Sequence, residues 1–111
     1  MKTPEGQVKE KVKTLLSGIP NLFFWMPVPT GYGTRGIPDF VGCYYGFFFG
    51  IETKATGGKQ TPWQKDIEKK IKAAMGFYIV AYNEEDVRAL LREIYLLRLR
   101  DPNAGADNSG R

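Results

Sequence analysis

The sequence predicts an α/β fold in which a mixed central sheet is flanked by helices, in the element order αβββαβα. Three stretches of the chain carry apolar residues at helical spacing, and four short apolar stretches between them fit strands. Two of the helical stretches begin with a Thr-Pro pair, Thr3-Pro4 and Thr61-Pro62, which suits an N-cap followed by the first helical position. We assign residues 1–100 to one domain and expect residues 101–111, which lack an apolar run, to form a flexible tail.

The first helix is expected over residues 4–17, because Thr3 can cap its start and Gly18 and Pro20 end it. Its buried stripe is predicted to contain Val8, Val12, Leu15 and Leu16. The run over residues 22–28 is short and apolar throughout, which predicts a buried strand. A glycine-rich loop over residues 29–36 follows.

Two strands, over about residues 39–44 and 47–54, are separated by Tyr45-Gly46, which predicts a hairpin. If these two residues are the centre of the turn, Asp39 lies directly opposite Glu52, with Cβ atoms roughly 4.5–5.5 Å apart. Lys54 then projects from the same face as Glu52. A four-residue loop keeps this pairing, whereas a loop of odd length would break it, and tyrosine does not favour a tight primed turn.

The second helix begins at Thr61-Pro62-Trp63-Gln64, where Thr61 is the cap and Gln64 completes a capping box. Its inward face is predicted to contain Trp63, Ile67, Ile71, Ala74 and Met75. Gly76 is expected to end the helix, and residues 77–82 to form a fourth strand. Asn83 can cap a last helix, whose buried stripe would be Val87, Leu90, Leu91, Ile94 and Leu97.

The composition limits the chemistry. Histidine is absent and Cys43 is the only cysteine, which excludes imidazole-based triads, an internal disulfide and most zinc sites. Catalysis would have to use carboxylates, lysines, tyrosines and a hard cation. The net charge of +4 suits a polyanionic partner. We find no membrane span or signal peptide and expect a cytoplasmic protein.

The facing carboxylates of Asp39 and Glu52 predict a cation site. Two such groups repel each other, and a hard divalent cation such as Mg²⁺ relieves the repulsion. The backbone carbonyl of Thr53 is a further candidate ligand, and Lys54 could stabilise developing negative charge. The trio also fits a solvated surface patch, although the apolar residues around it favour a half-buried sheet.

Glu5 lies seven residues before Val12, almost two helical turns, and so shares the apolar face of the first helix. A glutamate pointing toward the core is costly unless it is paired or binds a metal. An acid in the first turn also complements the helix dipole. The two interpretations are equally supported.

Three segments together resemble the PD-(D/E)xK nuclease superfamily, and within it the VRR-NUC (virus-type replication-repair nuclease) family. They are Gly36-Ile37-Pro38-Asp39-Phe40, Ile51-Glu52-Thr53-Lys54-Ala55 and Thr61-Pro62-Trp63-Gln64. The resemblance implies a restriction-endonuclease-like core. It also implies that Asp39 and Glu52, assisted by Glu5, ligate Mg²⁺, for which Mn²⁺ is expected to substitute. Lys54 would be the catalytic lysine, and Gln64 would contact the site or the DNA backbone, unless it serves only the capping box.

The resemblance further implies a structure-selective endodeoxyribonuclease that acts on branched DNA as a homodimer, as Holliday-junction resolvases do, in a bacterial or phage-infected cell. A flap, nicking or general DNA nuclease would use the same active site. A DNA-binding module without catalysis is the alternative from another class.

Four residues are candidate DNA contacts: Tyr32, Arg35, Lys59 and Lys65. Tyr32 and Arg35 lie in the glycine-rich loop, which matches G-x-G-x-x-G, but the strand after it excludes a dinucleotide site. A plain surface loop is an equally good interpretation. Lys65 belongs to a lysine stripe that Lys9 and Lys13 repeat on the first helix, and such a stripe is usually a solvated face.

Overall fold

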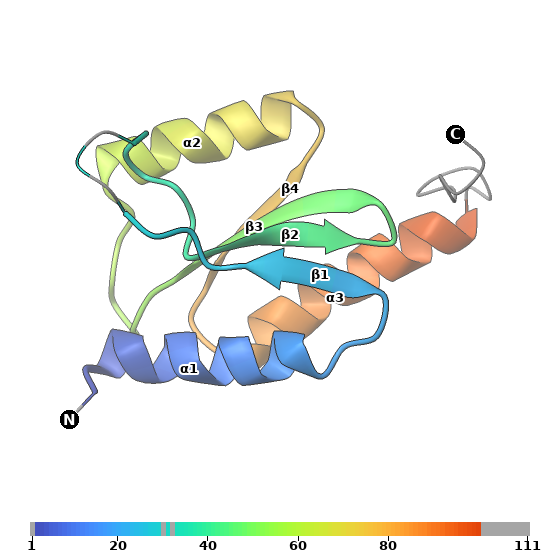
Figure 1. Ribbon diagram of the computed structural model, residues 1–111, viewed down its shortest axis with the longest axis horizontal. Helices are drawn as coiled ribbons and strands as arrows, with labels where there is room; N and C mark the ends of the chain where they lie inside the picture. Colours follow the sequence, from blue (N-terminus) through green and yellow to red (C-terminus); the bar gives the residue numbers. More distant parts are fainter. Residues whose placement is uncertain (1, 30, 32, 101–111) are drawn as a thin grey trace.

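The computed structural model describes residues 2–29, 31 and 33–100. They form the predicted order of elements (Figure 1): α1 (Pro4–Ser17), β1 (Leu22–Trp25), β2 (Phe40–Tyr44), β3 (Phe47–Thr53), α2 (Pro62–Ala73), β4 (Phe77–Ala81) and α3 (Glu84–Arg100). The expected tail and the candidate DNA contact Tyr32 lie outside the described residues. Among the described residues, no helix combines the length and apolar composition needed to cross a bilayer.

The strands form one mixed sheet in the order β1-β2-β3-β4, which confirms the predicted class of a mixed sheet flanked by helices. The first two pairings are antiparallel and the β3–β4 pairing is parallel, with α2 as the crossover. Tyr45 and Gly46 both have positive φ, 51° and 85°, as a primed hairpin turn requires. Phe40 pairs with Ile51, which confirms the predicted hairpin register, and Asp39 and Glu52 are the next residues beyond this last pair of the ladder.

One face of the sheet packs against α1 and α3 and forms the main core (Figure 1). Val12 and Leu16 of α1 are buried there, as predicted. Alternate strand residues point into the same core, including Phe40, Phe49 and Ile51, all 0% exposed. From α3 come Val87, Leu90, Leu91 and Ile94, whereas Leu97, expected in the same stripe, is 37% exposed. Asn83 caps this helix by accepting from the Asp86 N–H at 2.9 Å.

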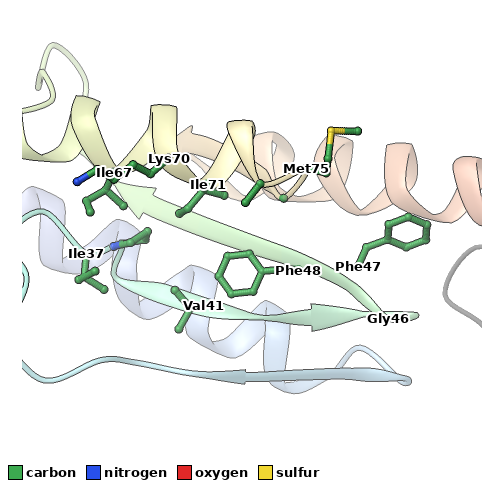
Figure 2. A pocket seen from close by; sticks show the side chains of 12 residues that line it. Ile37, Val41, Gly46, Phe47, Phe48, Ile67, Lys70, Ile71 and Met75 are labelled. Atoms are coloured by element: carbon green, nitrogen blue, oxygen red, sulfur yellow. The ribbon is translucent and has the colours of Figure 1, made fainter. Parts of the chain in front are cut away.

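The other face lies toward α2, which covers only part of it (Figure 1). Gly50 permits this packing, because a Cβ there would lie 2.9 Å from Pro38 Cγ and 3.3 Å from Ile71 Cδ1. An apolar groove of about 550 Å³ remains between α2 and the hairpin, where Figure 2 shows Ile71 of α2 above Phe48 and Val41 of the strands. Phe23, Trp25 and Phe48 are 64%, 50% and 42% exposed.

Three local predictions were wrong. The strand over 22–28 ends at Trp25, because the prolines at 27 and 29 lack the N–H that a ladder needs. The predicted inward face of α2 is too wide, since Trp63 is 50% and Met75 87% exposed and only Ile67 is buried. Met75, not Gly76, adopts the left-handed conformation after the helix, with φ 67°. Gly76 is instead required by close packing, because its Cβ would lie 2.9 Å from Ile71 Cγ2.

Candidate active site

The predicted catalytic residues meet at the end of the sheet beside the first turn of α2. Asp39 immediately precedes β2, and Glu52 and Lys54 lie at the end of β3 on the face toward α2. A cleft of about 570 Å³ is lined by these three side chains together with Glu5 and Gln64. The structure thus brings together residues from four parts of the chain that the sequence assigned to one site.

Asp39 is held by its neighbours on both oxygens. Its Oδ2 accepts from the Thr53 N–H at 2.9 Å and from the Thr53 hydroxyl at 2.6 Å. Its Oδ1 lies 3.2 Å from Lys9 Nζ. Thr53 therefore orients Asp39 through its N–H and hydroxyl, while the role expected of its carbonyl oxygen stays a prediction.

Among the described residues, Glu52 is the one buried residue with a charged side chain, and it is 3% exposed. Its Oε2 accepts from Gln64 Nε2 at 2.8 Å. Its Oε1 is buried and has no hydrogen-bond partner in the described part of the chain. Burial, and then the negative charge of Asp39, raise the pKa of Glu52 from 4.5 to about 8, and the Lys54 ammonium offsets part of the rise.

Gln64 serves the helix cap and the site at the same time. Its Oε1 accepts from the Thr61 N–H at 2.9 Å, and the Thr61 hydroxyl accepts from the Gln64 N–H, so the predicted capping box is confirmed. Because the cap engages the oxygen of the amide, the nitrogen must face Glu52. The two interpretations that the sequence left open are therefore compatible.

Lys54 lies between two acids. Its Nζ is 3.9 Å from Glu52 Oε2 and 3.9 Å from Glu5 Oε1, and its side chain is 11% exposed. The backbone N–H of Lys54 donates a hydrogen bond to the Ala81 carbonyl of β4 at 3.0 Å, which fixes the backbone at this point. Glu5 is 45% exposed and contacts the site from the first turn of α1, so its side chain faces Lys54 rather than the apolar core.

For two residues of the site, the sequence predicted a different location. Lys9 was expected on a solvated or DNA-facing stripe, but its ammonium pairs with Asp39. The signal was available, since Lys9 follows Glu5 by one helical turn and shares its side of α1. Trp63 was expected in the core, yet it lines the cleft, where the Arg35 guanidinium carbon lies 4.8 Å from the centre of its ring. Lys59 and Lys65, the other candidate DNA contacts, are exposed outside the cleft lining.

The donor set fits a hard cation that keeps most of its water. Within the described ranges, no group of three or more acidic, histidine or cysteine side chains is placed to hold a metal ion. Mg²⁺ does not need one, because it usually binds one or two carboxylates, several waters and substrate phosphate. Glu52 Oε1 is a buried oxygen beside the carboxylate of Asp39, and no described residue donates a hydrogen bond to it.

The cleft therefore combines two facing carboxylates, a nearly buried ammonium and an amide that fixes one of the carboxylates. This combination can hold a cation and stabilise negative charge that develops near it. No protein-family model matches this chain, and no curated protein sequence matches it.

Proposed function

We propose that this chain is a Mg²⁺-dependent endodeoxyribonuclease with a PD-(D/E)xK core, and that it hydrolyses phosphodiester bonds in the cleft at the end of the sheet. The observation that carries the proposal is Glu52 Oε1, which is buried in the same cleft as Asp39 and has no hydrogen-bond partner among the described residues. The other oxygen of this side chain, Oε2, lies 3.9 Å from Lys54 Nζ. A buried carboxylate oxygen without a partner is costly unless a ligand supplies the missing interaction.

Each residue has a role that follows from its contacts. Asp39 and Glu52 would hold Mg²⁺, assisted by Glu5, and Mn²⁺ should substitute. When bound, Mg²⁺ supplies Lewis acidity, which lowers the pKa of bound water and neutralises phosphate charge. Lys54 would stabilise the negative charge that develops on the phosphate oxygens.

Two further residues hold the carboxylates in position. Gln64 fixes the rotamer of Glu52 through its Nε2, and so leaves Oε1 as the free oxygen. Thr53 does the same for Asp39 through two short hydrogen bonds. The carboxylates are thus oriented before a substrate arrives, which is what electrostatic catalysis requires.

For the substrate we propose branched DNA, cut in the manner of a Holliday-junction resolvase, in the cytoplasm of a bacterial or phage-infected cell. The positive net charge of +4 favours a polyanion. A flap, nicking or general nuclease would use the same carboxylates, so the substrate shape must be measured.

Resolvase activity requires two active sites, and we propose that the chain works as a homodimer. The surface that supports this is the part of the sheet that α2 leaves uncovered, which carries Phe23, Trp25 and Phe48. The Phe23 and Trp25 rings lie 5.9 Å apart and form one continuous apolar patch. Sedimentation of the wild type and of Phe23→Glu tests the assignment, and a monomeric wild type would contradict it.

The deciding experiment is cleavage of a labelled four-way junction beside flap, duplex and single-stranded DNA, with Mg²⁺ or with EDTA. We expect symmetric Mg²⁺-dependent cuts in the junction by the wild type and none by Asp39→Ala. The matched control is Asp66→Ala, which removes an exposed acid of α2 that pairs with Lys70.

Three other outcomes are informative. Mg²⁺-dependent cutting of another substrate keeps the active site and removes the junction assignment. If the folded wild type binds DNA but cuts none of the substrates, the protein is a DNA-binding module without catalysis. A Lys54→Ala variant that binds DNA but no longer cuts it separates catalysis from binding.

A further inference from the structure

Trp63 is an exposed aromatic side chain in the wall of the candidate active site. It is the second residue of α2 and is 50% exposed, in a helix whose inward side buries only Ile67. Its neighbour Gln64 contacts Glu52 at 2.8 Å. The indole lines the same cleft as Asp39 and Glu52, and it contributes little to the core.

The loop before β2 carries a second planar group against this ring. Arg35 places its guanidinium carbon 4.8 Å from the centre of the Trp63 ring, within the range of a cation–π contact. Gly36 fixes the loop there: its φ is +81°, and a Cβ would lie 2.4 Å from the backbone carbon and oxygen of Trp63. The stacked pair is thus held by close backbone packing, and both residues line the cleft.

The helix cap does not explain the tryptophan. The capping box at this helix start uses the side chains of Thr61 and Gln64 and makes no use of the indole. Packing does not explain it either, because half of the side-chain surface is open to solvent. An exposed aromatic ring beside a cation, facing a phosphate-binding site, is typical of surfaces on which nucleobases stack.

We propose that Trp63 and Arg35 form a stacking platform for one unpaired base beside the phosphate that is cut. The proposal depends on the nuclease function above and deepens it, because it specifies the substrate class. Inside a duplex, away from its ends, each base is covered by its neighbours, so there an indole can stack only on a base that has left the helix. The preferred DNA therefore carries an unstacked nucleotide at the cleavage site, as branch points, flaps and single strands do.

The first experiment measures binding without cleavage, in Ca²⁺ or EDTA. In a Trp25→Phe background Trp63 is the only fluorescent indole, and in a Trp63→Phe background Trp25 serves as the control reporter. We expect single-stranded and branched oligonucleotides to quench Trp63, a blunt duplex of the same sequence to quench it much less, and Trp25 to respond weakly to all of them. Equal quenching by the duplex would overturn the platform.

The second experiment compares affinities for branched DNA. Trp63→Ala should weaken binding about 5- to 150-fold, the usual effect of losing one base–aromatic stack. Trp63→Phe should restore most of it. The control Leu99→Ala removes a similarly exposed apolar side chain, 56%, from α3. An abasic site placed next to the cut should weaken wild-type binding and leave Trp63→Ala unchanged.

The outcomes separate this inference from the nuclease proposal. If neither Trp63→Ala nor an abasic site changes metal-dependent cutting, the nuclease proposal stands and the stacking platform is wrong. If unpaired bases quench Trp63 fluorescence but the wild type never cuts DNA, the stacking platform stands and the nuclease proposal is wrong.

Discussion

The two faces of the sheet differ in what they bury. The face toward α1 and α3 is closed and apolar, with Phe40, Phe49 and Ile51 at 0% exposure. The face toward α2 buries the carboxyl group of Glu52 at one end and leaves Phe23 and Phe48 exposed at the other. The difference runs through single strands, since Phe48 and Phe49 are neighbours in β3 and point to opposite faces.

This comparison shows how a short chain separates stability from chemistry. One face provides a dry core, which stabilises the fold and needs no polar group. The other face can then tolerate two features that stabilise a small domain only weakly. One is the buried carboxyl group of Glu52, which lies 3.9 Å from the Lys54 ammonium, and the other is a sheet surface that α2 leaves partly uncovered. Alternating residues of β3 therefore serve two different purposes.

The largest effect should come from truncating the closed face. Phe49→Ala removes a fully buried ring and should lower the free energy of unfolding by about 3–5 kcal/mol. Phe48→Ala, the matched change one residue away, removes a ring that is 42% exposed and should cost about 1 kcal/mol. Urea unfolding of both variants measures the difference, and equal losses would contradict the assignment of the core to one face.

Much of the fold could be predicted from sequence because its signals are local. The turn at Tyr45-Gly46 sets the register of the hairpin, and that register alone places Asp39 opposite Glu52. The cap at Thr61 sets the start of α2 and the direction of the Gln64 amide. In each case a few neighbouring residues determine the geometry.

Other features depend on which element covers which, and local patterns do not contain that information. Apolar spacing placed Trp63 and Met75 in the core, but α2 packs through Ile67 and Ile71, and the residues at both ends of its apolar stripe are exposed. Lys9 was predicted as a surface lysine because its partner Asp39 is distant in the sequence, although the spacing of Lys9 from Glu5 already placed both on the same side of α1. Such contacts follow only from the packing of helices on the sheet.

The next effect concerns the buried carboxyl group on the open face. Because the pKa of Glu52 is raised to about 8 in the folded protein, its contribution to stability is present below its unfolded pKa near 4.5 and is lost as pH rises through 8. Without Mg²⁺, we expect the protein to lose up to a few kcal/mol through this group between pH 5 and about 8.5. Glu52→Gln should remove that slope in thermal melts.

Mg²⁺ provides the internal control for this pH dependence. If the carboxylates hold the cation, added Mg²⁺ should stabilise the wild type most at high pH, where Glu52 is ionised, and Glu52→Gln much less. A wild-type slope that persists in Glu52→Gln would mean that another group causes it.

A smaller effect should separate the cap of α2 from the site it supports. Thr61→Ala removes the hydroxyl that accepts from the Gln64 N–H and should cost about 1 kcal/mol of stability, with DNA cleavage by the folded protein unchanged. Gln64→Glu keeps an oxygen for the Thr61 N–H but replaces the donor to Glu52 with a second acid. It should lower cleavage at neutral pH by about tenfold or more, and it should also cost about 1–3 kcal/mol of stability because the buried Glu52 loses its donor. Loss of cleavage in Thr61→Ala alone would show that the cap itself controls the site.

The smallest effect concerns Lys9, which lies 3.2 Å from Asp39 in a partly exposed pair. Its ammonium offsets the repulsion between the two carboxylates when no cation is bound, and it competes with a cation for Asp39. Lys9→Gln should therefore lower metal-free stability by about 0.5–1 kcal/mol and tighten Mg²⁺ binding by a factor of about 2–5. Lys13→Gln, an exposed lysine one turn further along α1, should change neither. Calorimetric Mg²⁺ titrations distinguish the two roles, because a lysine that contacted only DNA would leave the affinity for Mg²⁺ unchanged and weaken DNA binding instead.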